Sequence, residues 1–392
     1  MLRIWFQEGL RKLKMLLLII MIFALYVAEI SACTSAIIGA NATPDGRPLL
    51  WKHRDTSTID NKVEYITSKE GEYNYVALFN ADDKRCEQAW IGMNDVGFAV
   101  MNTASYNIKD DNVPQKKMDK EGYLMTIALK SCRTIDDFER LLNTLPRPMG
   151  VEANFGAIDA EGNGAYFETN NHSYVKYDIK DAPGNVLVRT NYSHSGRPDE
   201  GFGFIREANA EHLLKPYIEN KSVTAEVLTE VLSRSFYHNL KGCDYATKGE
   251  KWVVDQDFIP RYKSTATIVI EGIPPIEDAS LIKPGDLGGK YIMWTGIGYP
   301  PCSEILPVWC IEGGVPDCLR GIGENGHSPL GDEIKARRDE VFSLKKGNGD
   351  KYIDMTKLFN EQGTGYVQRM RQLNKQTYEK TRRLRDVGYG KE

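Results

Sequence analysis

The chain has 392 residues, 41% of them hydrophobic, with a formal net charge of −4. This composition supports a sizeable buried core and excludes global disorder. The mild acidity is spread along the chain and excludes nucleic acid as the expected partner. The sequence contains neither a G-x-G-x-x-G motif nor a P-loop.

Residues 1–32 have the pattern of a secretory signal peptide. Basic residues precede an unbroken apolar run over 15–28, and a small residue stands directly before Cys33. The run is short for a bilayer-spanning helix, which needs about 20 apolar residues, and an uncleaved signal anchor is the alternative. We therefore expect export to the periplasm or the extracellular space. Residues 33–392 then form a single domain of charge −6, because four basic and two acidic residues are removed.

Strand patterns begin directly after Cys33. The residues TSAIIGA are β-branched or small, and the turn PDG leads into a second apolar stretch. This pattern predicts a β-hairpin that brings Lys52 and Asp55 back beside Cys33. Further strands are expected within 73–79, 88–94, 97–104, 154–169, 184–193, 265–272 and 290–298.

Helical patterns alternate with the strands in blocks. They cover 121–132, 134–145, 206–219, 224–236 and a C-terminal region of about 350–388. Thr134 can cap the second helix, because acidic residues follow it in the first turn. The order lacks the βαβ alternation of a parallel sheet, which indicates an α+β domain of stacked antiparallel sheets flanked by helices.

Seven cysteines leave at least one thiol unpaired if the others form disulfides. Disulfides among the six cysteines after Cys33 are plausible, with no basis for assigning their pairing. Cys302, Cys310 and Cys318 lie close together in sequence, but no C-x-x-C pair accompanies them and the chain has only six histidines. No metal and no cofactor are expected.

Cys33 has three interpretations. ISAC fits a loose lipidation pattern, but a lipidated cysteine is usually followed by a polar tether, whereas core-forming residues follow here. A buried or bridged structural cysteine is the default for a lone thiol, yet it does not explain the position of Cys33 at the cleavage point. The third interpretation is an N-terminal nucleophile.

Cleavage after Ala32 would place a thiol and a free α-amine on Cys33. An α-amine has a pKa near 8 and can accept the thiol's proton without any histidine. Asp55 can orient that amine, and Lys52 can supply a positive charge that favours thiolate. The side-chain amides of Asn102 and Asn191, which follow apolar strands, can donate to an oxyanion. Singly, each residue also fits a turn cap or a solvated charge.

The segment CTSAIIGANATPDGRPLLWKHRD resembles the opening of the N-terminal-nucleophile (Ntn) amide hydrolases, in particular the choloylglycine hydrolase and penicillin V acylase group and the isopenicillin-N acyltransferase-like proteins. GMNDVGFAVMN, VLVRTN, STATIVIEG and WTGIGYPPCSEILPVW resemble later strands of that group, so the resemblance spans most of residues 33–310. It implies a four-layer αββα sandwich and hydrolysis of a linear carbon–nitrogen (amide) bond.

The resemblance also implies roles for single residues. Cys33 matches the nucleophile, Asp55 the amine-binding aspartate, and Asn191 and Asn102 the asparagines of the oxyanion site. Arg261, in PRYKSTATIVIEG, is the best candidate for a late arginine of the family. The bile-salt enzymes have arginine where this chain has Lys52, so either Lys52 supplies a point charge or Arg54 has taken the role.

The sequence therefore predicts an exported cysteine amidohydrolase whose substrate is a small amide: an N-acyl amino acid, a conjugated bile acid, a penicillin-like amide or a small peptide. A dipeptidase of the related Ntn type, an acyltransferase and a non-catalytic, membrane-anchored lipoprotein lipidated at Cys33 are the alternatives. No membrane association is expected without that lipid, and a homo-oligomer is compatible with the sequence.

Overall fold

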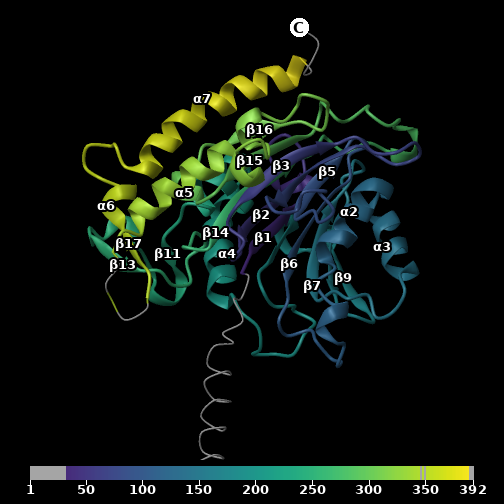
Figure 1. The fold of residues 1–392 in the computed structure, drawn as a ribbon, viewed down its shortest axis with the longest axis horizontal. Coiled ribbons are helices and arrows are strands. Elements are labelled where there is room, and N and C mark those ends of the chain that lie inside the picture. Colours follow the sequence, from purple (N-terminus) through teal and green to yellow (C-terminus); the bar gives the residue numbers. More distant parts are fainter. Residues whose placement is uncertain (1–31, 345–346, 348–349, 388–392) are drawn as a thin grey trace, which may run out of the picture. The chain divides into compact units, whose positions relative to one another are not determined.

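Two antiparallel β-sheets form the centre of the computed structural model, which describes residues 32–344, 347 and 350–387 (Figure 1). The first sheet contains β1 (Thr34–Ile38), β2 (Leu49–Asp55), β10 (Val186–Arg189), β14 (Ser264–Glu271), β15 (Ile292–Ile297) and β16 (Leu306–Val308). The second contains β3 (Asn61–Ile66), β4 (Tyr75–Asn80), β5 (Ile91–Asn94), β6 (Ala99–Ala104), β7 (Ala153–Ile158), β8 (Gly164–Thr169) and β9 (Tyr174–Asp178). The six-stranded sheet has the order β10-β1-β2-β14-β15-β16, and the seven-stranded sheet follows chain order.

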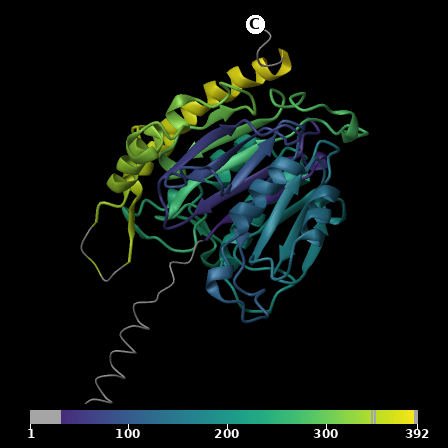
Figure 2. The same ribbon diagram turned by 45° about the vertical axis from the view of Figure 1, so that its right-hand side comes forward.

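Helices flank both sheets. They are α2 (Glu121–Ser131), α3 (Ile135–Thr144), α4 (Phe204–Glu219), the π-helical segment η5 (Val227–Leu232), α5 (Pro329–Val341), α6 (Met355–Leu358) and α7 (Tyr366–Val387). Helices α2 and α3 lie on the seven-stranded sheet, whereas α4, η5 and α7 lie on the six-stranded sheet (Figures 1 and 2). The predicted αββα sandwich is confirmed. Two small sheets pair β11 (Tyr237–His238) with β12 (Cys243–Asp244) and β13 (Trp252–Val254) with β17 (Tyr352–Asp354).

Strand β2 shows how the layers are built from sequence. All seven of its residues are buried, because both of its faces are covered. Leu50 belongs to the apolar cluster between the sheets, and Trp51 belongs to the cluster under the helices. Since side chains alternate along a strand, Lys52 and Arg54 face the seven-stranded sheet. His53, by the same alternation, faces the helical layer.

The capping prediction is also confirmed. Thr134 accepts a hydrogen bond from Asp137 N, and the Asp137 side chain accepts from the backbone N–H of Thr134, which together form a capping box. The box offsets two of the unpaired N–H groups at the start of α3. The local sequence alone is sufficient for this feature.

Two expectations need correction, and several elements had no prediction. The C-terminal region is not one helix, because Asn360 and Thr364 bond to each other across a loop and Gly363 has a φ of 71° between α6 and α7. None of the seven cysteines forms a disulfide. Strands β3 and β9, helix α5 and the strands of the two small sheets were not predicted from the sequence. Helix α5 has a readable start signal, because Ser328 caps it and Pro329 occupies its first turn.

The predicted signal peptide, apart from Ala32, lies outside the described residues. Within the described part of the chain, we find no helix with the length and apolar character needed to cross a bilayer.

Candidate active site

Cys33 directly precedes β1 and is only 6% exposed. The register pairs Ser35 with Lys52 on one side and with Arg189 on the other. The hairpin pairing continues past β1, since Ala32 N donates to the Asp55 carbonyl at 3.2 Å. The predicted return of Lys52 and Asp55 to the neighbourhood of Cys33 is therefore confirmed.

The Asp55 carboxylate is buried and held on both oxygens. Ser264 Oγ donates to Oδ1 at 2.6 Å, and Arg261 donates to Oδ2 through Nη2 at 2.6 Å and Nε at 3.1 Å. The same Arg261 Nη2 lies 3.4 Å from the carbonyl oxygen of Ala32, the residue bonded to the nitrogen of Cys33. Burial opposes the charge of Arg261, but attraction to Asp55 outweighs it and raises the arginine's pKa. Arg261 Nη2 thus links the Asp55 carboxylate to the carbonyl oxygen of the Ala32–Cys33 peptide.

His53 and Ser264 extend the hydrogen-bond network around the Asp55 carboxylate. Ser264 has a single hydrogen and gives it to Asp55, so its oxygen accepts from His53 Nε2 at 2.8 Å. The imidazole is then neutral with its hydrogen on Nε2, and within the described chain its Nδ1 has no hydrogen-bond partner. Burial is the main cause that lowers the pKa of His53 to about 4, against the attraction of Asp55.

The Lys52 side chain extends from β2 in the six-stranded sheet to β6 in the seven-stranded sheet. Its Nζ donates at 2.8 Å to Asn102 Oδ1, on β6, and at 2.8 Å to the carbonyl of Trp90. Burial lowers the pKa of Lys52 to about 7; the negative charge of a Cys33 thiolate opposes this shift, and the charge of Arg54 adds to it. Asn102 must turn its oxygen toward the cation, which leaves the two hydrogens of its Nδ2 for other acceptors.

Arg54 has different hydrogen-bond partners from Lys52. It donates to Asn61 Oδ1 at 2.5 Å and to Asn80 Oδ1 at 2.8 Å, and its guanidinium lies 5.0 Å from the centre of the Trp90 ring. Of the two basic residues that the sequence left as alternatives, Lys52 is the one bonded to a predicted oxyanion asparagine.

Asn191 and Arg206 meet next to Cys33. Asn191 Nδ2 donates to the Ala104 carbonyl at 2.9 Å, and its Oδ1 accepts from Arg206 Nη2 at 2.9 Å. Arg206 Nη1 donates to the Cys33 carbonyl at 2.6 Å and to Thr34 Oγ1 at 3.0 Å. Burial, followed by repulsion from Arg261, lowers the pKa of Arg206 to about 10. Arg206 carries no signal in the sequence, because an arginine in a polar helix usually faces solvent.

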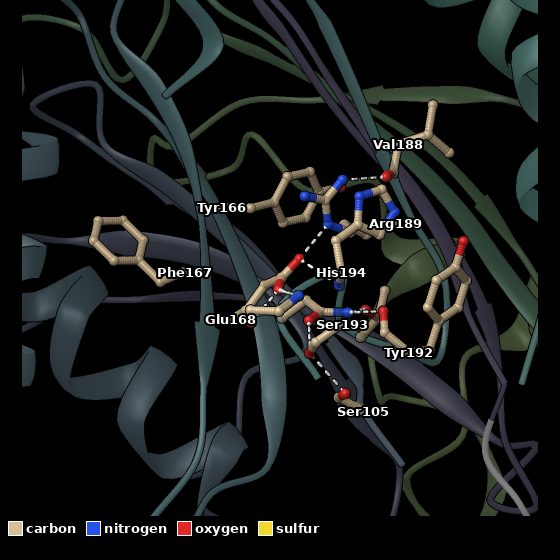
Figure 3. A network of polar contacts seen from close by, with 12 residues as sticks. Ser105, Tyr166, Phe167, Glu168, Val188, Arg189, Tyr192, Ser193 and His194 are labelled. Carbon is tan, nitrogen blue, oxygen red and sulfur yellow. Dashed lines mark hydrogen bonds and ion pairs between the residues drawn. The ribbon is translucent and has the colours of Figure 1, made fainter. Parts of the chain in front are cut away.

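A buried network holds the chain on both sides of Asn191 (Figure 3). Glu168 is fully buried, and its Oε1 accepts from Arg189 Nε at 2.7 Å and from His194 N at 3.0 Å. Its Oε2 accepts from Ser195 N at 2.7 Å and Ser195 Oγ at 2.5 Å. Four hydrogen bonds satisfy this buried charge, so the segment that carries Asn191 is anchored to β8.

Among the residues that the structure describes, one group of side chains has the spacing of metal ligands. The ligand atoms of Asp60, His327 and Asp332 lie within 4.8 Å of one another. Lys335 Nζ is already 3.0 Å from Asp60 Oδ1, and His327 Nδ1 is 2.9 Å from Asp332 Oδ1. This ion-pair network accounts for the cluster without a metal.

The sequence matches no protein-family model and none of the curated proteins. Solved structures are similar at low identity. An N-acylethanolamine-hydrolyzing acid amidase ortholog from Caenorhabditis elegans is 13% identical over 63% of this chain and 95% of that chain, with a TM-score of 0.39. A mutant conjugated bile acid hydrolase from Clostridium perfringens is 12% identical over 71% and 92%, with a TM-score of 0.41.

Penicillin V acylase from Agrobacterium tumefaciens is similar at 12% identity over 71% of this chain and 86% of that chain, with a TM-score of 0.37. These TM-scores lie below 0.5, so the fold rests on the strand order and layer packing described above.

Proposed function

We propose that this protein is an exported cysteine hydrolase of the N-terminal-nucleophile type, which cleaves a linear amide through a thioester on Cys33. The observation that carries the proposal is the Asp55 carboxylate, ion-paired with Arg261 beside the Ala32–Cys33 peptide. Removal of residues 1–32 would convert that peptide nitrogen into an α-amine next to an anchored anion. Such an anion orients the amine as a base.

The steps then follow from the groups present. The α-amine takes the thiol proton, and the Cys33 thiolate attacks the acyl carbon of the substrate. Asn191 Nδ2 and Asn102 Nδ2 donate to the developing oxyanion, which is the largest stabilisation in reactions of this kind. The protonated amine gives its proton to the leaving nitrogen, the carbon–nitrogen bond breaks, and water hydrolyses the thioester.

Substrate and location complete the proposal. A small amide is the proposed substrate class, with N-acyl amino acids, conjugated bile acids, penicillin-like amides and small peptides as its members. Export rests on the basic and apolar pattern of residues 1–32. The burial of Cys33 weighs against a lipidated thiol, because acyl chains on that sulfur must reach a membrane.

Two mass measurements test this function. Intact mass of the exported protein is expected to correspond to a chain that begins at Cys33 without added acyl groups. Acid quenching during turnover of a chromogenic N-acyl amide is expected to trap an acyl adduct on the N-terminal peptide. A diacylglyceryl mass on Cys33, or an adduct on another residue, contradicts the proposal.

A further inference from the structure

The Arg206 guanidinium joins two predicted elements of the site. One nitrogen, Nη1, donates to the carbonyl oxygen of Cys33 at 2.6 Å. The other, Nη2, donates to Asn191 Oδ1 at 2.9 Å. Arg206 is 1% exposed, so neither bond competes with bulk water. The planar guanidinium of Arg206, a fork of two donor nitrogens, therefore bridges the nucleophilic residue and the candidate oxyanion donor.

The chemistry of an arginine settles the orientation of the Asn191 amide. A guanidinium has donors and no acceptor, so the amide must turn its oxygen toward Arg206. The amide nitrogen then points away, and the Ala104 carbonyl at 2.9 Å takes one of its two hydrogens. The second hydrogen remains for an acceptor in the site. A flipped amide would place an oxygen against the Ala104 carbonyl and present an acceptor to the oxyanion.

The backbone at Asn191 is held separately. Asn191 N and O pair with Phe202 O at 3.1 Å and Phe202 N at 3.2 Å, respectively. Glu168 anchors the flanking residues Arg189 and His194 (Figure 3). These backbone contacts do not fix the rotation of the Asn191 side-chain amide. Arg206 contacts the oxygen of that amide.

We propose that Arg206 is a positioning residue of the reaction: it locks the Asn191 amide with its nitrogen toward the oxyanion and ties that amide to the Cys33 backbone. This inference rests on the proposed function. Arg206 touches no reacting atom, and it acts through Asn191. Loss of the fork should therefore weaken the stabilisation of the oxyanion while leaving the thiolate's own reactivity intact.

Arg206→Lys tests the inference, because lysine keeps a positive charge but lacks a planar fork that can bridge two acceptors. Removal of an oxyanion donor costs about 10²–10³ in kcat, so we expect kcat to fall about 10- to 100-fold, with KM within about 3-fold. Alkylation of Cys33 by iodoacetamide forms no oxyanion, and its rate should stay at the wild-type value. Arg234→Lys is the matched control, since Arg234 is also buried but binds Glu230 and Ser303.

Combination with Asn191→Ala gives a second readout. If Arg206 acts through Asn191, the double variant should be no slower than Asn191→Ala alone. Independent, multiplying losses would overturn the inference, as would a wild-type kcat in Arg206→Lys or a parallel fall in the alkylation rate. Activity that survives Cys33→Ala would instead overturn the proposed function, so the two failures are distinguishable.

If Arg206→Lys does not fold, Arg206→Gln replaces it. The glutamine Nε2 can donate to one of the two acceptors but cannot bridge both, so kcat should again fall about 10- to 100-fold with KM within about 3-fold. A wild-type kcat in folded Arg206→Gln would overturn the inference.

Discussion

Arg261 binds the Asp55 carboxylate through two nitrogens, at 2.6 and 3.1 Å from the same oxygen, although 206 positions separate the residues in sequence. The Asp55 side chain is 1% exposed and that of Arg261 is 22% exposed, so this pair lies at the boundary between core and solvent. Burial of the Asp55 side chain strengthens its attraction to Arg261, because charges interact more strongly away from water.

Asp55→Asn is expected to lower kcat/KM by about 10² or more, because it removes the charge that orients the α-amine base. The amide oxygen can still accept from Ser264, but its Nδ2 then faces Arg261, so stability should fall by about 2–4 kcal/mol, as for Arg261→Gln. Steady-state kinetics on an N-acyl amide, with urea unfolding of the same sample, measure both effects. Wild-type kcat/KM in this variant would mean that Asp55 does not serve the base.

Arg261→Gln is expected to destabilise the fold by about 2–4 kcal/mol. Removal of one partner of a buried pair costs about 3–5 kcal/mol, and solvent at Arg261 reduces that figure. Urea unfolding at pH 7 measures it. Arg197→Gln is the control, because Arg197 and its partner Glu200 are about half exposed and their pair should contribute about 0–1 kcal/mol. Equal small effects in both variants would contradict the buried pair.

Cys33→Ala is expected to abolish amide hydrolysis while the protein remains folded, and Cys33→Ser to retain little activity, since a hydroxyl is far harder to deprotonate than a thiol. Kinetics together with circular dichroism separate loss of chemistry from loss of fold. Cys132→Ala is a matched thiol control, because Cys132 lies in the separate apolar cluster under α2 and α3. Full activity in Cys33→Ala would place the nucleophile elsewhere.

Lys52 should set an alkaline limb in the pH dependence of kcat/KM. Its pKa is lowered to about 7, so the positive charge that favours thiolate is present below about pH 7 and is lost as the pH rises. Lys52→Arg should shift that limb to higher pH, because a guanidinium stays charged. Identical limbs in the two proteins would exclude Lys52 as their source. A limb that responds to Arg54→Ala would assign the role to Arg54.

His53 should weaken the fold in acid. Its pKa is about 4 in the folded protein and about 6.5 when unfolded, so only the unfolded chain gains this proton between pH 6.5 and 4. Stability from His53 is complete above pH 6.5 and falls by about 3 kcal/mol as the pH drops to 4. His53→Gln can still donate to Ser264 and should flatten this slope in urea titrations. His212 is exposed, so His212→Gln should leave the slope of stability against pH unchanged. An unchanged slope in His53→Gln would contradict the buried neutral imidazole.

The local pattern was sufficient for features in which neighbouring residues interact. The hairpin over residues 33–55 and the helix cap at Thr134 were predicted, because turn chemistry, β-branching and short-range hydrogen bonds are properties of adjacent side chains. Strands β3 and β9 were missed, since both lie at edges of the seven-stranded sheet and half-exposed strands carry weak alternation. The missed helix α5 had a readable start in Ser328 and Pro329.

The site residues also divide into those that the sequence identified and those whose role depends on tertiary contacts. The residue types and their order along the chain singled out Cys33, Asp55, Asn102 and Asn191, and the resemblance added Arg261. The choice between Lys52 and Arg54 lay beyond the sequence, because both point from β2 toward the second sheet and only their partners there distinguish them.

From sequence alone came the block order of strands and helices, the antiparallel hairpin that opens the domain, and a nucleophile interpretation for Cys33. Only the tertiary structure placed Arg206 on the Cys33 carbonyl and Ser264 on the Asp55 carboxylate. The physical reason is that strand and turn formation depends on neighbours in the chain, whereas the pairing of a buried charge depends on which distant group the packing of two sheets and a helix brings within hydrogen-bond distance.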